Sequence, residues 1–110
     1  MGNTTDLTEE NSTEYALEVL RELHHLFSNE LSDTISSAHA AVTNGRISTG
    51  IRLIERVRVL STYLFALNMG HVYITGHSAI PGHAQFILSA CDRIRKYDEA
   101  LSEEAPPNAH

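Results

Sequence analysis

Apolar residues recur at helical spacing in three successive segments of the chain. In the first segment the steps between them are three or four residues: Ala16, Leu20, Leu23, Phe27, Leu31, Ile35, Ala38 and Val42. This spacing is typical of one face of an α-helix and predicts a helix over about residues 13–43. The polar pairs at residues 28–29 and 32–33 could break it into two helices, but no glycine or proline interrupts it, which favours one long helix. Asn44 and Gly45 are the predicted stop, because both tolerate a left-handed backbone.

Two further helices follow at similar spacing. The second is predicted over about residues 49–68, capped by Ser48 or Thr49 and stopped by Gly70, with this apolar face: Leu53, Val57, Leu60, Leu64 and Leu67. Its second half is apolar nearly all round, which is typical of a buried central helix. The third is predicted over about residues 80–101, with a proline in its first turn and this apolar face: Ile80, Ala84, Ile87, Cys91 and Ile94.

These elements predict an all-α protein, a small antiparallel bundle of three helices, or four if the first helix is broken. Residues 6–101 form the expected single domain, and residues 1–5 and the acidic tail 102–110 are expected to be disordered. Residues 72–75 are the strand-like stretch, with nothing to pair with. A first helix of roughly 30 residues would be about 45 Å long, which suggests a second chain along it and hence a homodimer.

Composition narrows the class of protein. The 110 residues are 42% hydrophobic and 20% charged, which is ordinary for a globular domain. A single cysteine, a polar start and the lack of an apolar run of about 20 residues predict a cytoplasmic protein without a membrane span. The net charge of −6 is unevenly spread, with an acidic front over residues 1–33, a basic middle and an acidic end.

The segment GHVYITGHSAIPGH, residues 70–83, contains three Gly-His pairs six residues apart. The glycines are expected to end one helix, turn a loop and start the next, with the histidines as polar tips. Two alternatives remain open: a metal or small-ligand site built on His71, His77 and His83, and a binding loop whose charge changes between about pH 5 and 8. The spacing demands neither, and no cofactor is expected.

Catalytic motifs are missing from the sequence, so no enzyme is expected. Nucleophile elbows, phosphate-binding glycine loops and zinc-protease motifs do not occur. Cys91 lies on the apolar face of the third helix, where a cysteine acts as a small hydrophobe. The segment 44–50 precedes a helix and could hold a phosphate, although two helix caps explain its residues equally well.

A protein of this description is expected to act through its surface, as a regulator, adaptor or inhibitor of another protein. The candidate partner-binding residues are the acidic face of the first helix and the Gly-His segment: Glu14, Glu18, Glu22, His71, Tyr73, His77 and His83. The alternative is a nucleic-acid-binding regulator that uses a basic surface: Arg46, Arg52, Arg56 and Arg58. The overall acidity argues against this alternative.

Overall fold

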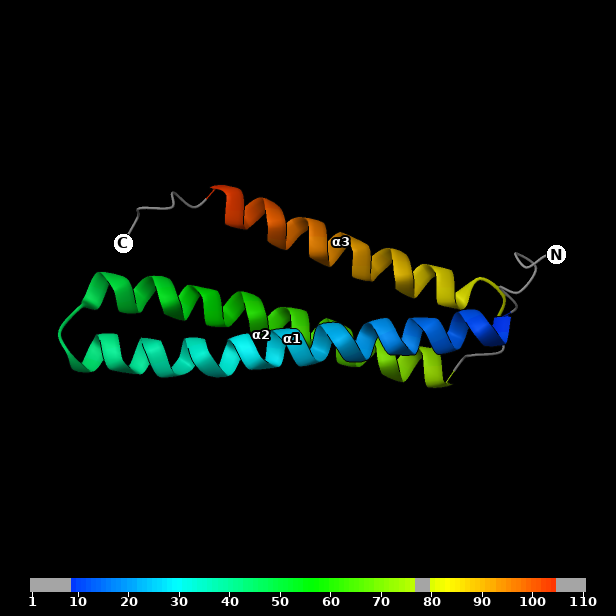
Figure 1. Ribbon diagram of the computed structural model, residues 1–110, viewed down its shortest axis with the longest axis horizontal. Coiled ribbons are helices and arrows are strands. Elements are labelled where there is room, and N and C mark those ends of the chain that lie inside the picture. Colours follow the sequence, from blue (N-terminus) through cyan, green and yellow to red (C-terminus); the bar gives the residue numbers. More distant parts are fainter. Residues whose placement is uncertain (1–8, 77–79, 105–110) are drawn as a thin grey trace.

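The computed structural model describes residues 9–76 and 80–104, and in them the chain forms three helices (Figure 1). They are α1 (Glu9–Thr43), α2 (Ile47–Gly76) and α3 (His83–Glu104). No strand occurs in these two ranges. Helices α1 and α2 pack against each other as an antiparallel hairpin, and α3 runs back along it with more contact to α1 than to α2. The predicted small all-α bundle of three helices is confirmed.

Helix α1 is continuous through both polar pairs that could have broken it. Thr34, which is buried, satisfies its hydroxyl by donating a hydrogen bond of 2.7 Å to the carbonyl oxygen of Glu30, one turn earlier. The helix begins at Glu9, before the predicted start at about residue 13. Residues 1–5, expected to be disordered, lie outside the described residues.

The turn between α1 and α2 is the one that the sequence predicts. Gly45 has a positive φ of 80°, which glycine adopts at little cost. The Arg46 N–H donates to the Ala41 carbonyl at 2.8 Å and the Gly45 N–H to the Val42 carbonyl at 3.1 Å, which is the Schellman pattern of a helix end. Helix α2 starts at Ile47, directly after this turn. Ser48, which was predicted to cap the helix, therefore lies inside its first turn.

Helix α2 is longer than predicted, because Gly70 does not end it. A Cβ on Gly70 would lie 3.4 Å from Leu20 Cδ2 of α1 and 3.6 Å from Ile87 Cδ1 of α3. The glycine therefore marks a point where the three helices approach closely, and packing there outweighs its low helix propensity, a cost of about 1 kcal/mol. Residues 72–75, strand-like by composition, are helical, and Ile74 is fully buried.

Helix α3 begins at His83, slightly later than predicted. Gly82 precedes it with a φ of 78°, and its carbonyl accepts the first helical hydrogen bond, from Phe86 N–H. Pro81 and Ile80 lie before the helix rather than in its first turn. The helix continues to Glu104, so residues 102–104, expected to be disordered, are helical, and residues 105–110 lie outside the described ranges.

The core lies where all three helices meet, between the first half of α1, the second half of α2 and the first half of α3. Its buried members are Ala16, Leu20, Leu23, Phe27, Leu60, Tyr63, Leu67, Ile74, Ala84, Ile87 and Cys91. The rings of Phe27 and Tyr63 lie 4.9 Å apart between centroids, which joins α1 to α2. Most of these residues belong to the predicted apolar faces, and Tyr63 and Ile74 are additions.

The other half of the hairpin, residues 31–54, has little cover, because α3 diverges from it toward its own C-terminal end (Figure 1). There α1 and α2 approach closely through small residues, and a Cβ on Gly50 would come within 2.7 Å of Val42 Cγ2. Ile35 and Val42, predicted to be core residues, are about half exposed for this reason. The radius of gyration is 17.6 Å, against about 13 Å for a compact chain of this length.

None of the helices in the described ranges is long and apolar enough to cross a membrane.

Candidate interaction surface

The outer face of α2 carries a line of exposed apolar side chains. We call it the α2 stripe: Ile47, Ile51, Ile54, Phe65, Met69 and Val72, each between 48% and 67% exposed. At 100° per residue these positions lie roughly opposite the buried side of the same helix, which carries Leu60 and Leu67. Arg58, Ser61 and Thr62 continue the same line through its middle, and all three are exposed.

The α2 stripe contradicts the prediction that the second half of α2 is a buried central helix. Phe65 is 67% exposed, the highest value among the large hydrophobic side chains described. The reason is geometric: in a bundle of three helices each helix has only two neighbours, which cannot cover all of its sides. Helix α1 covers one side of α2 and α3 only a neighbouring flank, so the outer side faces solvent.

A shallow apolar groove adjoins the α2 stripe on the side of α3. Its volume is about 490 Å³, and Met69 belongs both to it and to the stripe. The groove is lined by small and aromatic residues: Ala66, Met69, Gly70, Tyr73, Phe86, Ile87 and Ala90. The rings of Tyr73 and Phe86 stand edge to face, 6.1 Å apart. An apolar groove of this kind can receive the apolar face of an amphipathic helix.

The Gly-His segment is divided between two helices. Tyr73 of α2 stacks on the buried ring of His83 at the start of α3, with 3.8 Å between centroids and 28° between planes. His71, two residues before Tyr73, lies on nearly the opposite side of α2, because two residues turn a helix by about 200°. His77 lies outside the described residues.

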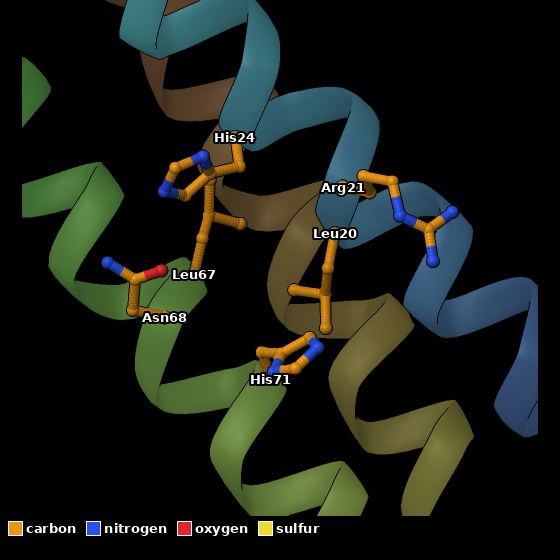
Figure 2. Close-up of a pocket in the computed structure, with 6 residues that line it drawn as sticks. All are labelled: Leu20, Arg21, His24, Leu67, Asn68 and His71. Carbon is orange, nitrogen blue, oxygen red and sulfur yellow. The ribbon is translucent and has the colours of Figure 1, made fainter.

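His71 borders a different hollow, on the α1 side of α2 (Figure 2). Its volume is about 230 Å³, with Leu20 and Leu67 beneath and with His24 and Asn68 beside it. Figure 2 shows that the guanidinium of Arg21, the sixth lining residue, points away from His24. Across residues 9–76 and 80–104, no group of three or more histidine, cysteine, aspartate or glutamate side chains is placed to hold a metal.

The predicted acidic residues Glu14, Glu18 and Glu22 are all exposed. They follow one another at steps of four, so they form one acidic line on the outer side of α1. This placement leaves them accessible to a partner.

The four predicted arginines do not form one surface. Arg46 lies at the turn, and Arg52 and Arg58 are exposed on α2. Arg58 contacts Glu55 at 3.3 Å on the same helix. Arg56 turns inward instead, so the basic surface of the nucleic-acid alternative lacks one of its four members.

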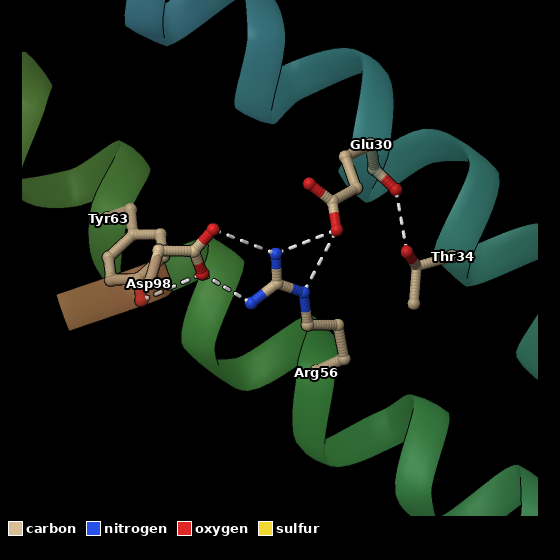
Figure 3. Close-up of polar contacts among 5 residues, drawn as sticks. All are labelled: Glu30, Thr34, Arg56, Tyr63 and Asp98. Carbon is tan, nitrogen blue, oxygen red and sulfur yellow. Dashed lines mark hydrogen bonds and ion pairs between the residues drawn. The ribbon is translucent and has the colours of Figure 1, made fainter. Parts of the chain in front are cut away.

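Arg56 joins the three helices (Figure 3). Its guanidinium contacts Glu30 of α1 at 2.7 Å and Asp98 of α3 at 2.6 Å. Tyr63, also on α2, donates a hydrogen bond of 3.1 Å to Asp98. Burial alone would lower the pKa of Arg56, but the hydrogen bonds to Asp98 and Glu30 outweigh it and raise that pKa. Burial, helped by Asp98, raises the pKa of Tyr63 to about 12.

Cys91 is buried in the core, as the sequence predicts. Burial raises the pKa of its thiol, and Arg95 opposes this only in part. A buried cysteine with a raised pKa is a poor nucleophile at neutral pH.

Comparisons of the chain with protein-family models, with curated proteins and with solved structures find no match.

Sequence reasoning missed the α2 stripe, although its signal is in the sequence. Ile47, Ile51 and Ile54 step by four and three residues, and so do Phe65, Met69 and Val72. This is a second apolar line beside the core-facing one, and two such lines on a helix indicate two neighbours. The sequence does not tell whether the second neighbour comes from the same chain.

Proposed function

We propose that this protein is a non-enzymatic helical interaction module that acts as a regulator, adaptor or inhibitor through the α2 stripe and the adjoining groove. The observation that carries the proposal is the exposure of six large apolar side chains along one side of one helix. From Ile47 to Val72 they extend about 38 Å at 1.5 Å per residue.

The spacing of the α2 stripe suits a helical partner. Isolated exposed hydrophobic residues are common on protein surfaces and need no explanation. The two apolar halves of the stripe, residues 47–54 and 65–72, are different, because each exposes to water an apolar line that another surface can cover. Steps of four and three residues match the ridge of an amphipathic helix laid along α2.

The polar clusters support a structural role rather than catalysis. Arg56, Asp98 and Tyr63 are engaged with one another across the bundle. Cys91 is enclosed among core side chains. The proposed place of action is the cytoplasm, in line with the single cysteine of the chain.

Nucleic-acid binding stays an alternative prediction with reduced support, because Arg56 is paired with two carboxylates. Metal binding by the Gly-His segment also stays a prediction. It is weakened because His71 lies on a different side of α2 from Tyr73, on which the ring of His83 stacks, so the two histidines are kept apart.

The test is affinity capture from an extract of the native cells with three versions of the protein: unchanged, Phe65→Glu and Leu26→Glu. Leu26 is the matched control, since it is 57% exposed and lies on α1. We expect a protein that is retained by the unchanged chain and by Leu26→Glu, and lost with Phe65→Glu, before and after nuclease treatment. Retention that ignores Phe65 contradicts the proposal, and retention that nuclease abolishes favours the nucleic-acid alternative.

A further inference from the structure

We infer that the α2 stripe is the contact surface of a homodimer in which two copies of α2 pack antiparallel, centred next to Leu60. This inference rests on the proposed function, since it names the partner of the same surface. The length of the first helix predicts a homodimer with its contact along that helix. The exposed side chains of α2 place the contact on the second helix instead.

The symmetry of the stripe identifies a second copy as its occupant. A twofold dimer needs a self-complementary surface, because a residue that contacts another must be contacted by it in return. In an antiparallel pair, Ile54 lies opposite Phe65 of the second copy, Ile51 opposite Met69, and Ile47 opposite Val72. The outer pairs, 47–72 and 54–65, are centred between Val59 and Leu60, and the middle pair, 51–69, is centred on Leu60, half a residue away. Three independent pairs thus agree on one register.

Side-chain size and spacing agree with that register. Each half of the stripe steps by four and then three residues, and a reversed half steps by three and then four. The outer pairs, 47–72 and 54–65, therefore align directly, and the middle pair, 51–69, is displaced by one residue, so every apolar position still lies next to another. Ile54 faces the larger side chain of Phe65, and Ile51 faces the longer side chain of Met69. Ile47 faces Val72, which is branched like isoleucine and slightly smaller. Large residues against smaller ones fill the space between two helices evenly.

The polar centre of the stripe is compatible with the same arrangement. Arg58 lies opposite Ser61 and Thr62 of the second copy, so the two arginines are offset by about one helical turn. The side chain of Arg58 is 76% exposed and paired with Glu55 of its own helix. It can therefore turn its charge to solvent at the edge of the contact while its stem packs.

The shape of the monomer leaves room for this contact. Helix α1 packs on one side of α2, α3 on a neighbouring flank, and the stripe lies away from both. Two copies joined along α2 would bury Phe65, the most exposed large hydrophobic side chain described.

The experiment measures the mass of the protein in solution by sedimentation equilibrium, from about 1 µM to about 500 µM, a range that covers weak and strong dimers. Two variants, Ile54→Glu and Phe65→Lys, are studied alone and as an equimolar mixture. Alone, each loses both of its 54–65 pairs, and we expect dimerisation at least tenfold weaker. In the mixture, one pair becomes Glu–Lys and the other is the original Phe–Ile pair, so dimerisation should recover.

The matched control mixture combines Ile54→Glu with Met69→Lys, in which the two new charges are not opposite each other in this register. It should recover less than the first mixture. Circular dichroism checks that every variant stays helical, as expected for exposed positions.

The outcomes separate this inference from the proposed function. A chain that is monomeric at about 500 µM, a dimer that both single variants leave unchanged, or equal recovery in the two mixtures overturns the inference. If the protein is monomeric and the captured partner still depends on Phe65, the interaction module stands and only the homodimer falls. If neither self-association nor capture depends on Phe65, both fall.

Discussion

Replacement of Arg56 by alanine is expected to destabilise the bundle strongly, because it removes a side chain that contacts both α1 and α3 through charge. The side chains of Arg56 and Asp98 are 24% and 18% exposed, and that of Glu30 is 42% exposed. Breaking a fully buried pair costs about 3–5 kcal/mol, and breaking an exposed one costs about 0–1 kcal/mol. For these intermediate exposures we expect a loss of about 2–3 kcal/mol, most of it from the contact with Asp98.

Urea unfolding followed by circular dichroism, at one fixed protein concentration, measures this loss. With a slope of about 1.5 kcal/mol per molar urea, the midpoint should fall by between about 1 and 2 M. The matched control is Arg58→Ala, which breaks the pair with Glu55, whose side chains are 76% and 63% exposed. It should change the free energy of unfolding by no more than about 0.5 kcal/mol.

A double-mutant cycle with Asp98→Ala assigns the loss to the pair. The two single changes should each be costly, and the double change should cost clearly less than their sum, since neither partner is then left alone. If Arg56→Ala costs no more than Arg58→Ala, or if the two single effects simply add, the ion pair does not hold α3 to the hairpin, and the reasoning is refuted.

Three further predictions concern the core. The Tyr63 phenol should titrate near pH 12 instead of near 10, seen as the difference in absorbance at 295 nm between the unchanged protein and Tyr63→Phe. Because its pKa is raised on folding, its stabilising contribution is complete below pH 10 and is lost as the pH rises through 12; a difference transition at pH 10 would contradict this. The Cys91 thiol should react with a thiol reagent at neutral pH only as fast as the bundle opens, so low concentrations of urea should speed the reaction. A reaction as fast as that of a free thiol, and unchanged by urea, would show instead that the thiol is accessible in the folded protein. Gly70→Ala should raise the free energy of unfolding by up to about 1 kcal/mol, since the new methyl group meets side chains of α1 and α3 at ordinary contact distances, whereas Gly70→Val should lower it. A lower free energy of unfolding with alanine would show that the close approach at Gly70 tolerates no side chain.

The fold class could be predicted because each helix carries a clear apolar face and the first turn carries a strong local signal. Asn44 and Gly45 specify a helix end through backbone conformation alone, without help from distant residues. Gly70 is the opposite case. Its local preference, about 1 kcal/mol against a helix, is smaller than the packing of α2 against Leu20 and Ile87, and a single sequence does not reveal that packing.

The polar network and the α2 stripe could not be predicted for a related reason. The contact between Arg56 and Asp98 joins residues 42 positions apart and depends on how α3 is rotated about its axis, which apolar spacing fixes only roughly. The stripe is visible as spacing in the sequence. Whether Phe65 and Met69 are core or surface residues depends on how many helices surround α2, and that number follows only from the assembled bundle.

The strength of the inferred dimer follows from the exposure of the same side chains. Twelve side chains, six from each copy and each about half exposed, would contribute about 1 kcal/mol apiece if the contact removed the rest of their surface from water. The total gain is about 12 kcal/mol. The loss of independent motion on association opposes it, and we take this cost as about 6 kcal/mol, near the low end of the usual range because the helices are rigid. The difference of about 6 kcal/mol corresponds to a dissociation constant of tens of micromolar. A contact of this strength forms and separates with changes in concentration. It also leaves the stripe open to a competing amphipathic helix, so the dimer and the regulatory interaction proposed for the same surface would exclude each other.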